Sequence, residues 1–369
     1  MKEKRKILHV VEAMGGGVFT YLVELANGMC EDFDVTIALG IRSETPENYE
    51  SYFDERVSLV QVENFTRGLN PVKDLRACIE LKKIVKDVKP DIIHLHSSKA
   101  GAIGRMVFSG RKYTMFFTPH GYSFLMQDIS GLKRKVYKVI EKICGKRNCI
   151  TVACGESEWE QGSKIAKKST FISNGININK IQKLIDSAEE VEREENHKFT
   201  VYTVGRADFQ KNPTLFNEIA KRLPHIQFVW IGDGERRDKL TSSNIKVTGW
   251  LENGQALSNA KSYDVFILAS RYEGLPISLL EAMYMKKLCV VSNVVGNRDV
   301  IRNNHSGYVC NNLEEFVEVI GRLEREGIEQ RIVDHAYNAI INHFNSGWLV
   351  EKYEELYIEQ LNSRLKDRK

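Results

Sequence analysis

The sequence predicts an α/β protein made of two Rossmann-like halves, each a parallel sheet covered by helices. Short apolar runs typical of strands alternate with helical patterns through nearly all of the 369 residues. Such alternation produces parallel sheets with helices on their faces. A charged stretch without apolar periodicity, residues 187–198, divides these runs into two sets. A chain of this length is long enough for two domains.

The predicted strands follow one another in two series. The first comprises 6–11, 34–40, 57–62, 91–96, 113–119 and 149–155, and the second 199–205, 226–232, 244–249, 264–270 and 288–293. Helical patterns lie between them, for example at 74–88 and 212–223, and the tail 347–365 is amphipathic. We therefore expect an N-terminal domain over 1–180, a linker over 181–198 and a C-terminal domain over 199–345.

Composition narrows the class of protein. The chain is 42% hydrophobic and 28% charged, as soluble globular proteins are. A net charge of +4 is too small to indicate nucleic acid, so we expect no nucleic-acid partner. No apolar run approaches the roughly 20 residues of a membrane helix, and the basic, then apolar N-terminus is interpreted as the first strand rather than a signal peptide. The seven scattered cysteines match no zinc spacing and are expected to be reduced, in the cytoplasm.

Three glycines, Gly15 to Gly17, separate the first strand from a helical pattern. A dinucleotide fingerprint would need a third glycine where Thr20 stands and an acid at the end of the second strand, which reads "ALGIR". NAD is therefore disfavoured. A plain tight turn and a loop that lets a substrate approach the backbone both remain open.

The block "ILASRYEGLPISLLEAM" carries the most specific pattern. Glu273 follows a strand, Gly274 lets the backbone approach a ligand, and Pro276 suits the first turn of a helix that carries Glu281. A helix N-terminus facing the carboxyl end of a strand is an anion site. The two glutamates, spaced E-x7-E, can accept sugar or ribose hydroxyls. In "TVGRADFQKN", Arg206 and Lys211 suit a diphosphate, with two solvated surface cations as the plainer alternative.

Other segments supply weaker candidates. His120 follows a strand in "FFTPHGYSF", while His94 and His96 share one face of a strand before Lys99. A metal pair is conceivable there, but no carboxylate or cysteine accompanies the histidines, so we favour hydrogen bonding near an acceptor. Trp250 and Leu251 could flank a nucleobase, although a core position for Trp250 is as good an interpretation. Asp233 and Glu235 could cap a helix or contact substrate.

Taken together, "EGLPISLLEAM", "VGRADFQKN", "ISNGIN" and "IGDGE" resemble the retaining glycosyltransferases of glycosyltransferase family 4. The resemblance covers nearly the whole chain. "HLHSSKAGAIGR" and "TPHGYSF" are similar to the subset that builds bacterial capsules and exopolysaccharides. One departure is "VVGNRDVI", where the family often has Gly-Gly and a Glu; it leaves a role for Asp299 open.

The resemblance implies a GT-B fold, with an acceptor-binding N-terminal domain, a nucleotide-sugar-binding C-terminal domain and a last helix, within 346–369, that returns to the first domain. It implies that Arg206 and Lys211 neutralise the diphosphate, that Glu281 holds the ribose, and that Glu273 and His120 contact the donor sugar. The remaining donor-site residues implied by the matching motifs are Gly16, Gly17, Asn174, Gly232, Trp250, Leu251, Gly274 and Leu275.

The implied reaction moves a hexosyl group from a nucleoside diphosphate sugar, with UDP preferred, to a hydroxyl of a glycan acceptor, with retention. No cofactor and no metal is expected, because fixed cations can stabilise the leaving diphosphate. The only D-x-D, Asp32-Phe-Asp34, precedes a strand, at the edge opposite to the one where ligands gather. No protein nucleophile is assigned.

Residues 131–147, "GLKRKVYKVIEKICGKR", read as a basic amphipathic helix. Such helices bind anionic membrane surfaces, so we expect peripheral binding to the inner face of the cell membrane, where a lipid-linked acceptor would lie. An ordinary solvated face is the alternative. Other function classes left open are a sugar-nucleotide epimerase, a phosphorylase and a non-catalytic nucleotide-sugar-binding protein.

Overall fold

The protein is described by a computed structural model that covers residues 4–12, 14–42, 45–66, 68, 70–126, 129–187 and 198–366. It divides into two compact units, one formed by 1–174 with 346–369 and the other by 175–345. The division falls six residues before the predicted end of the N-terminal domain. Helix α6 (Ile178–Ser187) therefore belongs to the second unit. Of the predicted linker 181–198, residues 188–197 lie outside the described residues.

The first unit is built on a seven-stranded parallel sheet, ordered β3-β2-β1-β4-β5-β6-β7. Its strands are β1 (Arg5–Val11), β2 (Phe33–Leu39), β3 (Ser58–Gln61), β4 (Ile92–His96), β5 (Thr114–Thr118), β6 (Ile150–Ala153) and β7 (Lys168–Phe171). Strand order reverses between β1 and β4, and the crevice at such a switch point is where open α/β sheets bind ligands.

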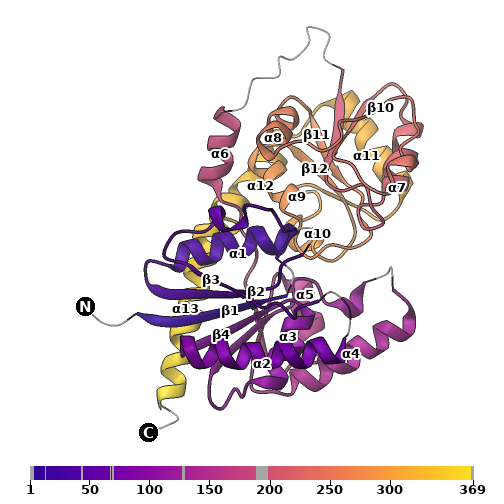
Figure 1. Ribbon diagram of the computed structural model, residues 1–369. Helices are drawn as coiled ribbons and strands as arrows, with labels where there is room; N and C mark the ends of the chain where they lie inside the picture. Colours follow the sequence, from indigo (N-terminus) through magenta and orange to yellow (C-terminus); the bar gives the residue numbers. More distant parts are fainter. Residues whose placement is uncertain are drawn as a thin grey trace. The chain divides into compact units, whose positions relative to one another are not determined.

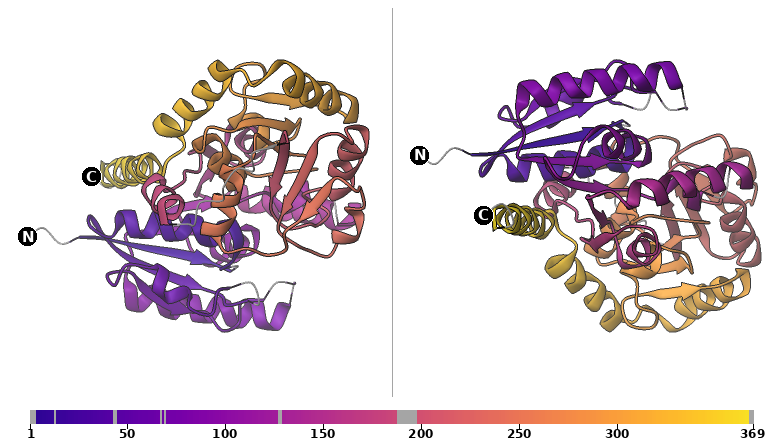
Figure 2. Two further views of the ribbon diagram at one scale, coloured as in Figure 1. Left: turned by 90° about the horizontal axis from the view of Figure 1, so that it is seen from above. Right: turned by 90° about the horizontal axis from the view of Figure 1, so that it is seen from below.

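Helices cover both faces of this sheet (Figure 1). They are α1 (Gly16–Met29), α2 (Pro71–Val88), α3 (Ser98–Val107), α4 (Gly131–Gly145), α5 (Glu156–Ser163) and α13 (Ser346–Lys366), with 3₁₀ turns at Tyr49–Tyr52 and Ser123–Leu125. One core contains α1 together with α13, and the opposite core contains α2 and α3. Both views in Figure 2 look along α13, with the sheet between it and α2.

Helix α13 therefore returns to the first unit, as predicted. Leu349, Tyr353 and Tyr357 are fully buried in the same core as the inward face of α1. These three positions are spaced by four residues, which places them on one side of the helix. The amphipathic pattern of the tail is thus the pattern of a helix docked on a sheet.

The second unit has a six-stranded parallel sheet, ordered β10-β9-β8-β11-β12-β13. The strands are β8 (Thr200–Val204), β9 (Gln227–Ile231), β10 (Ile245–Val247), β11 (Val265–Leu268), β12 (Leu288–Ser292) and β13 (Tyr308–Cys310). Helices α6, α7 (Pro213–Arg222), α8 (Asn253–Lys261), α9 (Ile277–Tyr284), α10 (Asn297–Val300), α11 (Leu313–Glu326) and α12 (Gln330–His343) flank it, with a 3₁₀ turn at Arg237–Lys239. Its switch point lies between β8 and β11.

All eleven predicted strands are present, and the two sheets are parallel as expected. The eleven predicted strands did not include β7 or β13. Both strands lie at sheet edges and are short, and β7 is half exposed with the polar sequence KSTF. A strand paired on one side needs no continuous apolar run, so hydrophobic patterning does not reveal it.

Candidate active site

Glu273 is the centre of a hydrogen-bonded cluster in the second unit. It follows β11, and its side chain is almost wholly buried. Lys211 Nζ donates to Oε1 at 2.7 Å, and Ser270 Oγ donates to the same atom at 2.7 Å. Gln210 Nε2 donates to Oε2 at 3.1 Å. The loops after β8 and β11, neighbouring strands at the switch point, thus meet through one carboxylate.

Further hydrogen bonds, from β12 and α10, hold the main chain at Ser270. Ser292 Oγ, at the end of β12, donates to the main-chain oxygen of Ser270 at 2.6 Å. The buried Asn297 donates to Ser292 from α10. Asn297 stands in the segment that departs from the family pattern, so this segment here holds the loop that carries Glu273. The sequence pattern had not indicated Gln210, Ser270, Ser292 or Asn297.

Arg206, the other predicted diphosphate cation, lies on the loop after β8 and is exposed. Among the residues that the structure describes, its guanidinium has no acidic partner. Lys211 differs, since it is largely enclosed and paired with Glu273. Before any ligand binds, Arg206 is therefore solvated, whereas the charge of Lys211 is already neutralised by Glu273.

Glycines bring the loops of this edge close together. Gly232 has a φ of +132°, and a Cβ atom there would lie 2.3 Å from the main-chain oxygen of Gly205. A Cβ on Gly296 would lie 2.3 Å from the oxygen of Gly274. Only glycine fits a backbone at such distances. Gly232, the first glycine of "IGDGE", is therefore required by the close packing of these two loops, independently of any ligand.

Helix α9 begins beside Glu273. Pro276 is its N-cap rather than its first helical residue, no side chain caps it, and its first turn holds no acid. Gly274 and the buried Leu275 lead into this end. An uncapped N-terminus at the carboxyl edge of a parallel sheet attracts anions.

Glu281 lies on α9, one turn before its end. Burial raises its pKa to about 7. Within the described part of the chain, no side chain or main-chain group forms a hydrogen bond with its carboxyl group. A carboxyl group that is partly buried and unpartnered is suited to receive hydroxyl donors from a ligand.

Trp250 and Leu251 have different environments. Trp250 is 67% exposed, so its core interpretation is wrong. Leu251 packs against the core of the second unit and, with Leu184, lines a pocket of about 780 Å³ between α6 and α8. Neither Arg206 nor Lys211 lines that pocket. Asp233 accepts a hydrogen bond from Gly234 and pairs with Arg237. The 3₁₀ turn that follows has Arg236 as its N-cap and no side-chain cap, so the expected capping by Asp233 is not seen.

In the first unit, the glycine loop joins β1 to α1. Gly15 is the N-cap of α1, and Gly16 and Gly17 are its first residues. Gly16 has a φ of +56°, and a Cβ on either residue would meet nothing within 4 Å. The space in front of this loop is thus open. Asn174, the last residue of the N-terminal segment, is buried with its Oδ1 lacking a hydrogen bond.

Three histidines at the same edge form a hydrogen-bonded chain, in which His9 and His96 are buried and His120 is partly buried. His9 Nδ1 lies 2.9 Å from His96 Nε2, and His96 Nδ1 lies 3.0 Å from His120 Nε2. His120 Nδ1 in turn lies 3.5 Å from Cys154 Sγ. Both ring nitrogens of His120 are therefore engaged within the protein. A hydrogen bond from either nitrogen to a donor sugar would have to replace one of these contacts.

His94 packs its ring against His96 and forms hydrogen bonds with α13 and β5. Its Nδ1 lies 2.5 Å from Tyr357 Oη, and its Nε2 lies 2.8 Å from Thr118 Oγ1. His94 and His96 therefore form hydrogen bonds within the protein, and their proximity to an acceptor stays a prediction. His9, His94 and His96 offer ring nitrogens within 4.8 Å of one another, but all except His9 Nε2 already have hydrogen-bond partners.

Burial keeps these imidazoles neutral. It lowers the pKa of His9 and of His120 to about 3, and it lowers the pKa values of His94 and His96 well below their ordinary range. A hydrogen bond between two neutral rings needs one N–H and one lone pair. The tautomers of His9, His96 and His120 are therefore coupled. His120 also has a φ of +52°, a strained conformation at the sheet edge.

Three other predictions have simple outcomes. Asp32 lies in the turn before β2, and Asp34 is the second residue of β2, so both lie at the amino end of the sheet. All seven cysteines are free thiols, and six of them are buried. Lys99, expected near an acceptor, pairs with Asp74 at 2.8 Å and donates to Thr66.

The face of α4 opposite the core is unusual. Leu132, Val136, Val139 and Ile143 are all exposed, by 43% to 74%, and their spacing places them in one stripe. Glu141, Cys144 and Gly145 are buried on the other side. Basic residues border the stripe, among them Lys135, Lys138 and Lys142. An apolar stripe with basic borders is the pattern of an interfacial helix. No helix among the described residues is long and apolar enough to cross a bilayer.

Comparisons with known proteins agree with this architecture. Residues 15–180 match the family described as Glycosyltransferase Family 4, and residues 185–339 match Glycosyl transferases group 1. A UDP-Gal:alpha-D-GlcNAc-diphosphoundecaprenol alpha-1,3-galactosyltransferase from Escherichia coli is 30% identical, over 84% of this chain and 86% of that protein. The N-acetyl-D-galactosaminyltransferase of Campylobacter jejuni that acts on GalNAc-alpha-(1->4)-GalNAc-alpha-(1->3)-diNAcBac-PP-undecaprenol is 25% identical, over 93% and 97%.

Solved structures share the fold at low identity. Sucrose-phosphate synthase from Thermosynechococcus elongatus has a TM-score of 0.78 and 14% identity, over 97% of this chain and all of that one. Anabaena HepE in complex with UDP and glucose has a TM-score of 0.73 and 14% identity, over 96% and all of that chain. The chain therefore belongs to the family 4 glycosyltransferases, with the GT-B fold, and is an enzyme of sugar transfer.

Proposed function

We propose that this glycosyltransferase moves a hexosyl group from a nucleoside diphosphate sugar, with UDP preferred, to a hydroxyl of a lipid-linked glycan, in cell-surface polysaccharide synthesis. The observation that carries the proposal is the cluster at the carboxyl edge of the second sheet. There Arg206 is solvated, Lys211 is bound to Glu273, and α9 begins without a cap. Cations and an open helix end in one place suit a diphosphate.

The residues at this edge of the sheet have different roles in the proposed reaction. The leaving diphosphate gains negative charge as the sugar–phosphate bond breaks, and Arg206, Lys211 and the first N–H groups of α9 stabilise it electrostatically. Loss of one such fixed donor typically costs roughly 3–4 kcal/mol in the transition state. Glu273, held by three hydrogen bonds, receives hydroxyls of the donor sugar, and Glu281 receives those of the ribose.

Retention of configuration and independence from metal are part of the proposal. Fixed cations at the diphosphate remove the need for a divalent ion. The single D-x-D lies at the amino edge of the first sheet, away from the edge where parallel sheets bind ligands. The diphosphate itself can accept the proton of the attacking hydroxyl on the same face of the sugar, which requires no protein nucleophile.

A lipid-linked acceptor is supported by the relatives that use diphosphoundecaprenol-linked sugars. The exposed stripe of α4 supports peripheral binding to the inner face of an anionic membrane, from the cytoplasm. Vesicle flotation that does not depend on anionic lipid would contradict this part of the proposal, and leave the transferase chemistry untouched.

The first test is a thermal-shift panel of UDP-, GDP-, ADP- and dTDP-sugars in the presence of EDTA. One nucleotide should raise the melting temperature, and Arg206→Ala should abolish that rise. Stabilisation by a nucleotide sugar without transfer to any acceptor would favour the sugar-nucleotide epimerase or the binding protein. No stabilisation by any nucleotide sugar, with or without metal, would overturn the donor site.

A further inference from the structure

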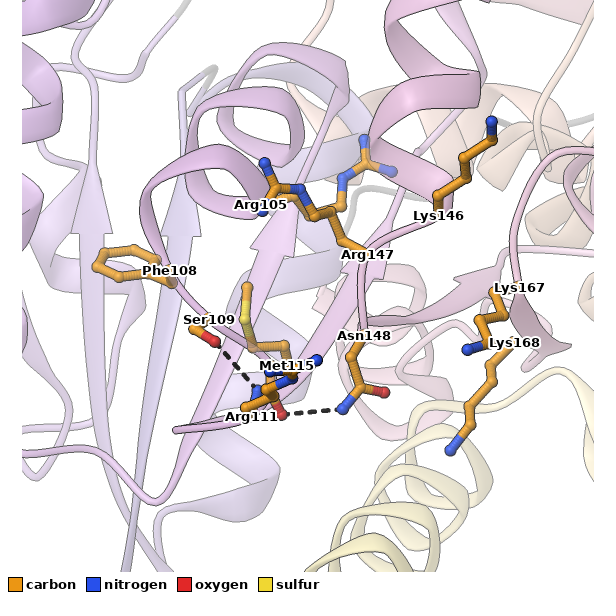
Figure 3. A pocket seen from close by; sticks show the side chains of 11 residues that line it. Arg105, Phe108, Ser109, Arg111, Met115, Lys146, Arg147, Asn148, Lys167 and Lys168 are labelled. Carbon is orange, nitrogen blue, oxygen red and sulfur yellow. Dashed lines mark hydrogen bonds between the residues drawn. The ribbon is translucent and has the colours of Figure 1, made fainter.

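A basic pocket of about 650 Å³ lies within the first unit. Figure 3 shows its lining, which contains six cationic side chains and no acid. They are Arg105, Arg111, Lys146, Arg147, Lys167 and Lys168. Five of them precede β5, β6 or β7, and Lys168 is the first residue of β7, so the pocket lies at the amino edge of the sheet.

One of these six cations is paired with an acid, and the other five have no counterion among the described residues. Arg105 is buried, pairs with Glu141 at 2.8 Å and stacks on Phe117. It forms the inner wall and adds no free charge. The other five side chains are on exposed residues, and none of them forms an ion pair with any of the residues described. Like charges so arranged repel one another unless an anion occupies the space between them.

The pocket is held in shape by hydrogen bonds and close contacts between its loops. Asn148 Nδ2 donates to the oxygen of Gly110 at 3.0 Å, as Figure 3 shows, and Lys167 N donates to the oxygen of Gly145 at 2.9 Å. A Cβ on Gly110 would lie 1.6 Å from the oxygen of Asn148. The loops that carry Arg111, Arg147 and Lys167 are therefore packed against one another, so the cations are gathered on a fixed frame.

The apolar stripe of α4 runs toward this pocket. Lys146 and Arg147 follow Ile143 by three and four residues, and Lys146 keeps a helical backbone. They continue the line of Leu132, Val136, Val139 and Ile143 beyond the end of the helix. If the stripe inserts into the outer part of a bilayer, the pocket at the end of α4 therefore lies at the level of the lipid phosphates.

We propose that the basic pocket binds the phosphate of an anionic phospholipid headgroup while the stripe of α4 enters the bilayer. The inference rests on the proposed membrane association and names its lipid partner. The diphosphate of the acceptor is not the occupant, because His120 and the glycine loop lie at the opposite, carboxyl edge. A five-residue strand such as β5 separates the two edges by roughly 16 Å. A second copy of the chain is disfavoured, since it would bring a second set of cations.

The test uses full-length protein and flotation with phosphatidylcholine vesicles, with and without phosphatidylglycerol. Lys167→Ala with Lys168→Ala removes two exposed charges of the pocket and leaves α4 intact. Lys82→Ala with Lys83→Ala, an exposed pair on α2, removes the same charge elsewhere in the unit. We expect the pocket variant to lose about 30-fold in partitioning to phosphatidylglycerol vesicles, and the α2 variant less than about twofold.

The outcomes separate the pocket from the membrane association itself. Equal losses in the two lysine variants would show only diffuse attraction and overturn the pocket. Val139→Asp with Ile143→Asp tests the stripe: unchanged flotation of this variant would contradict the membrane association, whereas a loss confined to this variant would leave α4 as anchor and overturn the pocket. Glycerol phosphate that stabilises the wild type but not the pocket variant, with equal flotation of both, would assign the pocket to a soluble phosphate and overturn the lipid.

Discussion

Lys211 Nζ lies 2.7 Å from Oε1 of Glu273, so the enclosed cation predicted for the diphosphate is already paired. Binding of a donor must divide this pair, with the ammonium turning to phosphate and the carboxylate to sugar hydroxyls. Arg206 needs no such exchange, since it is solvated. The two cations should therefore respond differently to substitution.

Arg206→Ala should lower kcat/KM by about 10²–10³, because a fixed donor to the leaving group is lost. Its melting temperature without ligand should stay that of the wild type, since the side chain is exposed. Steady-state kinetics with the nucleotide sugar chosen by thermal shift would measure both. Lys239→Ala, an exposed cation on the same unit, is the matched control. An Arg206 variant with full activity would remove this residue from the mechanism.

Lys211→Ala should combine a kinetic loss with a loss of stability. It leaves Glu273, which is 9% exposed, without its charged partner, and an uncompensated buried charge costs about 3–5 kcal/mol. Glu273→Gln in the same background should restore part of the stability and none of the activity. Urea unfolding of the single and double variants provides the measurement. Additive losses would show that the ion pair is not coupled.

His96 should act on the reaction through His120, because it is fully buried and lies 3.0 Å from that ring. Asn at position 96 can place a polar atom where Nδ1 lies and keep the contact with His120. Gln can replace Nε2 and keep the contact with His9 instead. If His120 needs positioning, kcat should fall about tenfold or more in His96→Gln relative to His96→Asn, with donor KM little changed. Equal kcat values at equal stability would leave His96 a structural residue.

Acid should destabilise the first unit through its histidines. The unfolded chain takes up protons near pH 6.5, whereas the folded pKa values of His9 and His120 are about 3. The unfolded state therefore binds more protons between these values, and stability falls as pH drops below about 6.5. Each such histidine contributes roughly 1.4 kcal/mol per pH unit. Urea unfolding from pH 7 to pH 4.5 should give a smaller slope for His9→Asn than for the wild type, and equal slopes would contradict the assignment.

Glu281 should have the opposite dependence on pH. Its folded pKa of about 7 lies above the ordinary value of 4.5, so the folded state binds the extra proton between these values. Stability from this group is complete below about pH 4.5 and is lost as pH rises through 7. Glu281→Gln should raise stability by up to about 3 kcal/mol at pH 8, and weaken binding of the nucleotide sugar. A variant that is less stable than the wild type at pH 8 would contradict the burial argument.

Gly232→Ala should destabilise the second unit by about 2 kcal/mol or more, because the added Cβ meets the oxygen of Gly205 and the backbone has a positive φ. Gly131→Ala is the control, since a Cβ there meets nothing within 4 Å. Thermal unfolding of both variants would measure the difference. Equal melting temperatures would show that the β8 and β9 loops move apart at little cost.

The fold was predictable because parallel strands buried on both faces leave apolar runs that alternate with helices. The edge strands β7 and β13 were not predicted, because a strand at the edge of a sheet need not have a continuous apolar run. At the site, Glu273 and Lys211 were predictable from a motif, but their pairing was not. It depends on β8 lying next to β11, which the sequence pattern alone does not determine.

The histidine chain illustrates the same limit. Strand alternation placed His94 and His96 on one face, and hydrogen bonding followed from the absence of other ligands. His9 joins them only because β1 pairs with β4 in a register that sets His9 beside His94. Gln210 and Ser270 were missed for a simpler reason, since single polar residues near strand ends are common and carry no distinctive spacing.

The burial of Leu349, Tyr353 and Tyr357 in the first core has a consequence for how the chain is made. Strands β1 to β7 leave the ribosome long before α13 does, and the face of the sheet that α13 covers remains open throughout synthesis of the second unit. His94 likewise lacks the hydroxyl of Tyr357 during that interval. The nascent N-terminal half is thus a client for chaperones that shield apolar surface, and its folding is completed last although it is translated first.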